Sequence, residues 1–318
     1  MIEQDKALPR VISIVGPTAS GKSALSELVA KRLGTSVISI DSMQVYRGMD
    51  IGTAKATAEE QAAAVHRMLD VADPHANYSA AQYIEDAARC CDDIISRGKM
   101  PIIAGGTGLY IDSLISGRDF AAVEEDAKLR DWLGKEYDEV GGEAMLNQLR
   151  VFDPERAEKL AANDKRRIIR ATEIYMLTGI TATEHDRRTR EIPPRYDAKR
   201  IILGYKDREK LYARIDSRVD AMVAAGLFDE VAGLLADGVS TESTAMQAIG
   251  YKEAVLALRG EIEKNTAVQQ IKQNSRRYAK RQLTWFRRWE DALRIDWDDT
   301  PDISRAADLA EAWLGDNL

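Results

Sequence analysis

The chain has 318 residues, of which 45% are hydrophobic and 31% charged, with a formal net charge of −7. This is ordinary globular composition, sufficient for one large domain or two smaller ones. No run of about 18 apolar residues occurs, so a membrane span is not expected. The N-terminal MIEQDKALPR lacks the apolar core of a signal peptide. Cys90 and Cys91 are adjacent and the three histidines are scattered, so neither a disulfide nor a zinc site is indicated. We expect a cytoplasmic protein, and nothing demands more than a monomer.

A negative net charge argues against a nucleic-acid partner, but polyanion binding depends on where positive charge is concentrated. Residues 272–288, KQNSRRYAKRQLTWFRR, contain seven cations and no carboxylate. On one predicted helix these charges would repel one another unless a polyanion or carboxylates from elsewhere neutralise them. The stretch is therefore a candidate nucleic-acid interface.

The first 119 residues alternate between strand-like and helix-like segments. Apolar runs bounded by glycine predict strands, and apolar residues with helical periodicity predict helices. Strands are expected at 10–16, 36–41 and 100–106, helices at 22–34, 80–98 and 108–117, and a polar loop at 41–55. Ser79 is the expected cap of the second helix. The alternation predicts a parallel sheet with helices on its faces.

From about residue 120 to 194 the periodicity is helical throughout, with segments at 126–141, 142–152, 153–162 and 164–179. Pro193 and Pro194 then interrupt the chain, and strands return at 199–205 and near 293–298 before a closing helix. We therefore predict an α/β core built from residues 1–119 and 195–318, which includes the C-terminal basic helices. Residues 120–194 form an all-helical insertion domain.

The segment 16–23, GPTASGKS, matches the P-loop pattern G-x-x-x-x-G-K-[ST] between a predicted strand and a predicted helix. Consecutive backbone N–H groups at such a turn bind anions at the positive end of the helix dipole. We expect Lys22 to reach the terminal phosphates and the Ser23 hydroxyl to bind Mg²⁺. A purely structural glycine turn is the alternative. Any Mg²⁺-bound diphosphate or triphosphate suits this geometry, so the motif does not identify the ligand.

Segments typical of other P-loop proteins are missing. No N-K-x-D segment occurs, and the strand where an ATP motor would carry an acidic pair runs into Gly105, Gly106 and Thr107. Glycines there let a ligand approach the backbone, and Thr107 offers a hydroxyl or caps the next helix.

Asp41 follows the second strand, at the sheet edge where ligands of parallel sheets bind. It could bind Mg²⁺, cap the loop or act as a general base. The pattern favours chemistry with a phosphate leaving group on a nucleophile near Asp41.

Seven segments together closely resemble the bacterial tRNA dimethylallyltransferases, also called tRNA isopentenyltransferases. They occur in the family's order, from the first strand to about Trp289: GPTASGKS, DSMQVYRGMDIGTAK, AGGTGLY, NDKRRIIRATEIYMLTG, YARIDSRVDAM, QAIGYKE and YAKRQLTWFRRW. Many families share the P-loop, whereas DSMQVYRGMDIGTAK and RQLTWFR are far more specific. The resemblance implies a P-loop NTPase-like fold. It also implies transfer of a dimethylallyl group from dimethylallyl diphosphate to N6 of adenosine 37 in tRNA, with Mg²⁺ and no nucleotide consumed.

The resemblance also implies roles for individual residues. Asp41 is the general base, Thr107 contacts the bridging oxygen of the leaving group, and Arg218 adds positive charge. The diphosphate is held by Gly16, Pro17, Thr18, Ala19, Ser20, Gly21, Lys22 and Ser23. The tRNA is bound at its anticodon stem-loop by Asp41, Ser42, Met43, Gln44, Thr107, Arg166, Arg167, Ile168, Ile169, Arg170, Gln247, Ala248, Ile249, Gly250, Tyr251 and Lys252. Arg130 is a further candidate from the helical insertion. The charge of the basic stretch adds Arg276, Arg277, Lys280 and Arg281 as candidates.

Helical spacing places Arg166 and Arg170 on one face, while Ile168 and Ile169 turn toward the core. Among the aromatic residues of the basic stretch, we expect Trp285 and Phe286 to pack on the core. Base stacking remains open for Tyr278 and Trp289. The family often has two adjacent histidines where this chain has Val65 and His66, and we interpret His66 as structural.

Two other functions stay open on the sequence. A P-loop kinase acting on a small molecule or nucleoside would use Asp41 to activate a hydroxyl and would consume ATP. That hypothesis leaves DSMQVYRGMDIGTAK and the basic stretch unexplained. A non-catalytic RNA-binding protein would use the P-loop, residues 16–23, which we call the phosphate cradle, as a nucleotide switch. Its RNA affinity would not depend on Asp41.

Overall fold

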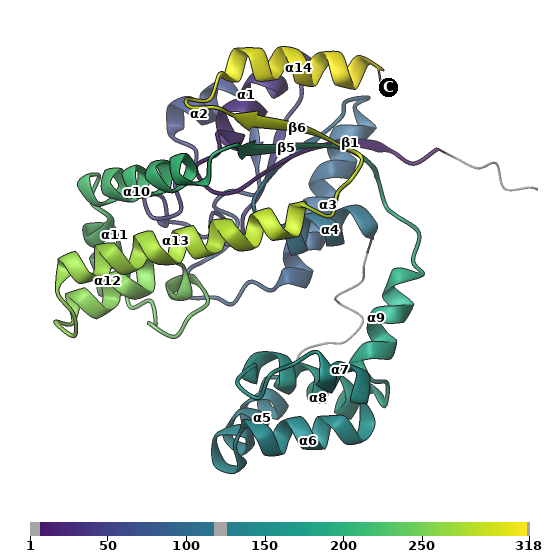
Figure 1. Ribbon diagram of the computed structural model, residues 1–318, viewed down its shortest axis with the longest axis vertical. Coiled ribbons are helices and arrows are strands. Elements are labelled where there is room, and N and C mark those ends of the chain that lie inside the picture. Colours follow the sequence, from purple (N-terminus) through teal and green to yellow (C-terminus); the bar gives the residue numbers. More distant parts are fainter. Residues whose placement is uncertain (1–6, 118–125, 317–318) are drawn as a thin grey trace, which may run out of the picture. The chain divides into compact units, whose positions relative to one another are not determined.

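The computed structural model describes residues 7–117 and 126–316 (Figure 1). It divides into two compact units, Met1–Ile115 with Arg195–Leu318, and Ser116–Pro194. The boundary expected between residues 119 and 120 lies outside the described residues. Within the described ranges, no helix is long and apolar enough to cross a membrane.

The first unit is built on a parallel sheet. Its described strands are β1 (Arg10–Val15), β2 (Val37–Ile40), β3 (His66–Arg67), β4 (Ile102–Gly105), β5 (Asp197–Tyr205) and β6 (Ala292–Trp297). Their order is β3-β2-β4-β1-β5-β6, and every neighbouring pair is parallel. The predicted parallel α/β core is confirmed. The two-residue β3 was missed because so short a strand carries no period.

Helices cover both faces of this sheet (Figure 1). The helices of the unit are α1 (Lys22–Leu33), α2 (Ala58–Ala63), α3 (Ala80–Ser96), α4 (Gly108–Ser116), α10 (Arg208–Ala224), α11 (Leu227–Ala236), η1 (Ala245–Gln247), α12 (Tyr251–Leu258), α13 (Lys264–Phe286) and α14 (Ile303–Asp316). Ile12 and Ile14 pack in one buried cluster with Leu25 of α1 and Ala306 of α14. Removing such aliphatic surface from water is the main source of the fold's stability. Ser79 caps α3 as predicted, since its side chain accepts a hydrogen bond from the N–H of Gln82.

The second unit is helical and has its own core. Its described helices are α5 (Ala127–Val140), α6 (Gly142–Phe152), α7 (Pro154–Glu158), α8 (Lys165–Thr178) and α9 (Ala182–Arg190). Leu133, Leu149 and Ile168 belong to one buried cluster. We did not predict α9, because its sequence ATEHDRRTR has almost no apolar residues that could show a period.

Candidate active site

The loops of the site follow three neighbouring strands. In the register of the sheet, Gly105 of β4 pairs with Val15 of β1 and with Ile40 of β2. The next residues along those outer strands, Gly16 and Asp41, therefore lie at the same edge. A Cβ on Gly105 would stand 2.0 Å from the carbonyl oxygen of Ile40, so this close approach requires glycine. The carboxyl ends of parallel strands are where open α/β sheets bind ligands.

The loop between β1 and α1 has the left-handed turns of an anion-binding nest. Ala19 has a φ of 64° and Gly21 a φ of 88°. A Cβ on Gly16 would stand 2.4 Å from the carbonyl oxygen of Leu203. Because α1 begins without a side-chain cap, its first N–H groups remain available to a ligand. A non-glycine residue in the left-handed region costs roughly 1–2 kcal/mol, so the surroundings must hold Ala19 in place.

Side chains from distant parts of the sequence hold the carbonyl groups of this loop. The indole Nε1 of Trp297 donates to the carbonyl oxygen of Ser20 at 2.9 Å. Nε of Arg214 donates to the carbonyl oxygen of Ala19 at 3.3 Å. These bonds occupy the carbonyls, so the N–H groups of the loop are the ones left for an anion.

Lys22 is the cation of the loop. Its Nζ donates to the carbonyl oxygen of Pro17 at 2.7 Å. Burial, and secondly the positive charge of Arg218, lower the pKa of Lys22 to about 7, while Asp41 partly opposes this shift. Near neutral pH the amine is therefore only partly protonated. A bound anion would favour the charged form.

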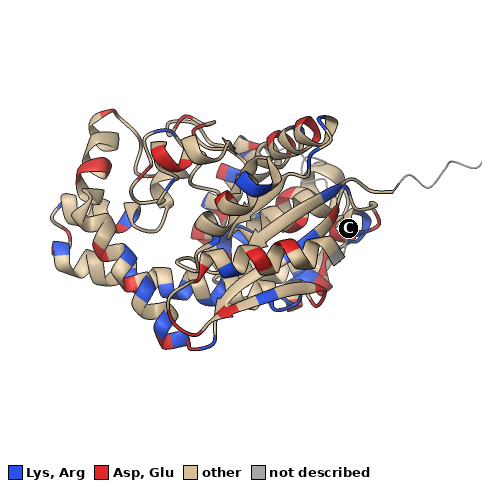
Figure 2. Ribbon diagram, turned by 90° about the horizontal axis from the view of Figure 1, so that it is seen from above, with Lys and Arg blue, Asp and Glu red and all other residues tan. Residues whose placement is uncertain are grey.

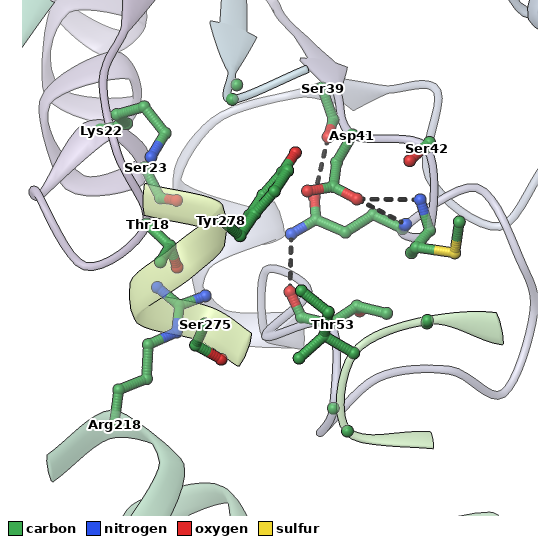
Figure 3. A pocket seen from close by; sticks show the side chains of 18 of the residues that line it. Thr18, Lys22, Ser23, Ser39, Asp41, Ser42, Thr53, Arg218, Ser275 and Tyr278 are labelled. Carbon is green, nitrogen blue, oxygen red and sulfur yellow. Dashed lines mark hydrogen bonds between the residues drawn. The ribbon is translucent and has the colours of Figure 1, made fainter. Parts of the chain in front are cut away.

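Arg218, on α10, faces the same cavity as Lys22 (Figure 3). Burial lowers the pKa of its guanidinium, and the negative charge of Asp41 opposes this. A guanidinium stays charged at all ordinary pH values. Arg218 therefore supplies a positive charge that does not change with pH, whereas the charge of Lys22 depends on pH.

Asp41 is held by an Asx turn. Its Oδ1 accepts hydrogen bonds from the backbone N–H of Met43 at 2.8 Å and of Gln44 at 3.4 Å. The other oxygen, Oδ2, accepts no hydrogen bond from a residue in the described ranges. The amide of Gln44 accepts from Ser39 and donates twice to the 53–54 turn (Figure 3). Gln44 therefore closes the 41–55 loop, and both its N–H donors are used.

The far end of the 41–55 loop is equally well held. The carboxylate of Glu230 accepts hydrogen bonds from the three N–H groups of residues 50–52, at 2.7–3.1 Å. The buried Nζ of Lys55 contacts Asp50 at 2.5 Å and Asp70 at 2.6 Å. The predicted loop is thus an irregular but fixed segment, because its backbone groups are bonded to side chains.

The segment from Gln247 to Lys252 joins the end of η1 to the start of α12 and contains both exposed and buried residues. Gln247 and Lys252 are exposed. Ala248 and Tyr251 are buried, and the Tyr251 hydroxyl donates to Glu230 at 2.5 Å. Our expectation that the side chain of Tyr251 contacts tRNA is wrong, because it is fully enclosed. Gly250 is also buried and has no side chain with which to contact RNA.

A cavity of about 330 Å³ joins these elements. Its lining includes the cradle residues Thr18, Lys22 and Ser23 and the acid Asp41. Aliphatic and thioether side chains complete it: Ile215, Val219, Met222, Leu227, Ile249 and Ile271. A site with convergent charged groups and an apolar wall suits a ligand with a phosphate end and a hydrocarbon end.

Thr107 lies next to this lining. Its Oγ1 is buried and makes no hydrogen bond of ordinary geometry with a described residue. The carbonyl oxygen of Thr107 accepts from the N–H of Ile111 at the start of α4, but the hydroxyl does not cap that helix. The alternative of a side-chain cap is therefore wrong, and a buried hydroxyl without a partner remains.

His66 is part of the cavity wall, which we did not predict. Its Nδ1 lies 2.8 Å from the carbonyl oxygen of Ala64, and its Nε2 lies 3.6 Å from Glu27. The side chain is 5% exposed. The signal that could have marked it is its position, because the family often has two adjacent histidines where this chain has Val65 and His66.

Helix α13 contributes Tyr278 and Gln282 to the cavity. Burial, and then the negative charge of Asp41, raise the pKa of Tyr278 to about 12, so its hydroxyl stays protonated at neutral pH. In Figure 3 Tyr278 stands between Asp41 and the side of the cavity that carries Lys22 and Thr18. We missed Gln282, although it lies in the RQLTWFR segment whose specificity we had noted.

Carboxylates within the first unit neutralise some cations of the basic stretch. Lys272 Nζ lies 2.7 Å from Asp220, and Arg276 lies 2.5 Å from Asp216, both on α10. Arg288 contacts Asp112 of α4. Acidic and basic residues are interspersed along the helices in Figure 2. One of our two alternatives for this stretch, neutralisation by carboxylates, therefore applies to these three cations.

The remaining cations of the basic stretch, except Arg288, are exposed and not paired with carboxylates of the described residues. Arg277, Lys280 and Arg287 are exposed and make no ion pair with a described residue. The guanidinium of Arg281 lies 5.4 Å from the centre of the Tyr278 ring and lines the cavity. This exposed set is the part of the stretch that is free to meet a polyanion.

The aromatic residues of the stretch behave differently from one another. Phe286 is buried, as predicted. Trp289 is only 7% exposed and packs on Phe286, so base stacking by Trp289 is wrong. Trp285 is half-buried; its Nε1 donates to Asp112 at 2.9 Å and the Arg288 guanidinium lies over its ring.

In the second unit, some arginines are exposed and others are bound to a buried carboxylate. Arg166 and Arg167 are exposed. Arg130 and Arg170 both donate to the buried Glu173, at 2.8 and 2.7 Å. Burial alone would raise the pKa of Glu173, but these two hydrogen bonds outweigh it and the pKa is lowered. Arg130 and Arg170 therefore also have a structural role.

Ile168 and Ile169 turn into the core of this unit, as their spacing predicted. Our further expectation that these two residues contact tRNA is wrong for their side chains, which are buried.

The fold and the site define an α/β enzyme of the P-loop type, with a phosphate cradle and an acid in one cavity. Two family profiles match the chain: "IPP transferase" over residues 44–289 and "Isopentenyl transferase" over residues 9–74. The chain belongs to the IPP transferase family, the family of the tRNA dimethylallyltransferases.

Its relatives are similar over nearly their whole length. A "tRNA dimethylallyltransferase" of Acetivibrio thermocellus is 45% identical over 92% of this chain and 93% of the relative. A "tRNA dimethylallyltransferase 1" of Trichlorobacter lovleyi is 46% identical over 88% and 91%.

Solved structures agree with these matches. The tRNA isopentenylpyrophosphate transferase of Bacillus halodurans is 39% identical, with a TM-score of 0.70, and the match covers 96% of this chain and 97% of that one. A eukaryotic dimethylallyltransferase described as acting on tRNA is 29% identical, with a TM-score of 0.81, over 97% of this chain and 80% of that one.

Proposed function

We propose that this protein transfers a dimethylallyl group from dimethylallyl diphosphate to N6 of adenosine 37 in tRNA and releases diphosphate. The observation that carries the proposal is a single cavity lined by a phosphate cradle, an acid and aliphatic side chains. Family membership supports the reaction class. The same arrangement gives a kinase no specific support, because the apolar wall suits a hydrocarbon better than a sugar.

The chain's first task is to stabilise the leaving group. Ionisation of an allylic diphosphate leaves a delocalised cation and places negative charge on the departing diphosphate. Lys22, Arg218 and the N–H groups of residues 19–23 act where this charge develops, and such electrostatic stabilisation usually contributes more to catalysis than any other effect. Thr107 has a buried hydroxyl free to donate to the bridging oxygen.

Mg²⁺ fits the residues present. Ser23 is exposed at the start of α1, and its hydroxyl has no hydrogen-bond partner among the described residues. Within the described ranges no group of three or more His, Cys, Asp or Glu residues could hold a metal alone. Mg²⁺ usually takes few protein ligands and completes its shell with phosphate oxygens and water. When bound at Ser23, it would neutralise charge on the diphosphate.

The acceptor amine requires a base and close positioning. Asp41 keeps Oδ2 free while Oδ1 is fixed by the turn, so its carboxylate can accept one hydrogen from N6. Adenine N6 is a weak nucleophile, and holding it in line with the allylic carbon contributes through proximity. To reach Asp41 the base must leave its stack, as in other enzymes that modify bases. Once the carbon–oxygen bond has broken and its electron pair has left with the diphosphate, N6 bonds to the allylic carbon and its proton passes to Asp41.

For the tRNA we propose contacts from both units. On α13 the candidates are the outward cations Arg277, Lys280 and Arg281, and in the second unit Arg166 and Arg167. Ser42, Met43 and Gln44 adjoin Asp41 and would meet the target base and its neighbours. Arg276 and Arg170 are engaged by carboxylates, so any contribution to RNA binding must compete with those pairs.

We further propose that the protein works in the cytoplasm, where its tRNA substrate is found, and as a monomer.

The test is mass spectrometry of unmodified tRNA incubated with the protein, Mg²⁺ and dimethylallyl diphosphate, with ATP in a parallel reaction. We expect one dimethylallyl group on adenosine 37, independent of ATP. No addition to a competent tRNA, together with ATP turnover, would overturn the proposal and favour a kinase.

A further inference from the structure

The buried side chain of Gln282 joins two backbone segments of the site. It is 5% exposed, and its Oε1 accepts a hydrogen bond from the N–H of Thr18 at 2.9 Å. Its Nε2 donates to the carbonyl oxygen of Gly106 at 3.1 Å. A Cβ on Gly106 would stand 2.0 Å from that nitrogen, so the amide fills the space that glycine leaves.

The two segments are neighbours that the sheet itself no longer connects. The paired residues of β1 and β4 end at Val15 and Gly105. Beyond that point the first strand enters the P-loop and the second turns toward Thr107. The amide of Gln282 adds one more link between them. The amide therefore sets the distance between the phosphate cradle and the turn after β4, which carries the unpartnered hydroxyl of Thr107.

We propose that Gln282 is a positioning residue for the diphosphate cradle. The inference rests on the proposed function, since it takes the anion to be a diphosphate. Both ends of the amide are used on the backbone, so Gln282 acts through the loop. Without it, the N–H of Thr18 loses its acceptor and the loop gains other conformations. Apparent anion affinity then falls in proportion to the fraction of molecules in the competent conformation.

The other bonds to the loop do not replace this link. Trp297 and Arg214 bind the carbonyl groups of Ser20 and Ala19. Neither bond reaches the segment after β4. A variant at Gln282 is therefore expected to change the spacing within the cradle while most of the loop's supports remain.

The experiment measures binding of inorganic diphosphate with Mg²⁺ by titration calorimetry, without tRNA. Gln282→Met keeps the size of the side chain and removes both hydrogen bonds. We expect about tenfold weaker diphosphate binding, which corresponds to about 1.4 kcal/mol and lies between the net values of one and two such hydrogen bonds. Gln273→Met is the matched control, since Gln273 is exposed on the same helix, and its affinity should equal that of the wild type. Filter binding of tRNA should change less than twofold for both variants.

A second variant separates positioning from a merely structural role. In Gln282→Glu a protonated carboxyl can still accept from Thr18 and donate to Gly106, whereas an ionised one cannot donate. The affinity of this variant, divided by that of the wild type at the same pH, should therefore fall as pH rises. Comparison at equal pH is needed because other titratable or charged groups line the cavity: Lys22, Asp41, His66, Arg218, Tyr278 and Arg281. A structural role alone would lower the melting temperature without this pH-dependent ratio.

The outcomes are distinct. If the wild type binds no diphosphate, the proposed function fails and this inference with it. If the wild type binds but Gln282→Met binds equally well, the inference alone is overturned. Should Gln282→Met fail to fold, the test rests on Gln282→Glu. If the diphosphate affinity of Gln282→Glu, divided by that of the wild type at the same pH, stays at 1 across the pH range, the inference is overturned.

Discussion

Lys22 provides the sharpest test of the electrostatics of the cradle. In the free protein its pKa is lowered to about 7 by burial and by Arg218. A bound diphosphate adds negative charge beside the amine and must raise that pKa. Binding of dimethylallyl diphosphate is therefore expected to draw one proton onto Lys22 from solution, to an extent that depends on pH.

The magnitude follows from the free-state pKa. With a pKa of about 7, about 0.1 of the amines are neutral at pH 6 and about 0.9 at pH 8. A terminal phosphate with a pKa near 6 is itself almost fully ionised at pH 8. Proton uptake on binding should thus be about 0.9 per site at pH 8. The Lys22 ammonium contributes fully to the affinity for dimethylallyl diphosphate below pH 7. Above pH 7 this contribution is lost, and the affinity falls by up to tenfold per pH unit.

The assay is calorimetric titration at pH 8 in buffers of different ionisation enthalpy, since the slope gives the protons taken up. Lys31→Met, at an exposed position of the same helix, should leave the uptake unchanged. Arg218→Gln should lower it, because removing the neighbouring charge raises the free-state pKa of Lys22. An uptake below about 0.2 in the wild type at pH 8, with affinity constant from pH 6.5 to 8.5, would refute the reasoning, because Lys22 would then be charged already in the free protein.

Three further predictions concern the base, the RNA surface and the sheet edge. Asp41→Asn keeps the acceptor of the turn and should lower kcat roughly 10²- to 10⁴-fold, with the Kd for dimethylallyl diphosphate changed only a few-fold; full activity would exclude Asp41 as the base. Arg277→Ala combined with Lys280→Ala should reduce the slope of log affinity for tRNA against log salt by about 1.5, whereas Arg276→Ala should mainly lower the melting temperature; equal slopes would contradict this division. Gly105→Ala should cost roughly 2–3 kcal/mol in urea unfolding, because its Cβ meets a backbone carbonyl, and unchanged stability would mean that the strands can separate there.

The sequence was sufficient for the elements whose causes are local. Residues 10–34 specify a strand, a glycine-containing turn and a helix in direct succession, so the phosphate cradle and Lys22 could be found by reading along the chain. Asp41 could be placed because it directly follows an apolar strand of a parallel sheet. The helical segment within 116–194 was also visible, since each of its longer helices buries one periodic apolar face. The polar α9 and the two-residue β3 lack such periods and were missed.

Only the tertiary structure shows which distant side chains bind the P-loop and which cations remain exposed for RNA. Gln282 and Trp297 bind the P-loop from 264 and 277 residues further along, a separation at which no sequence pattern gives a contact. The cations of α13 look alike in sequence, yet Arg276 faces Asp216 on α10 while Arg277 faces outward. Hydrogen bonds and ion pairs act over a few ångströms. The motif therefore fixes the chemistry of the cradle, while packing between remote helices fixes its shape and the charges left for RNA.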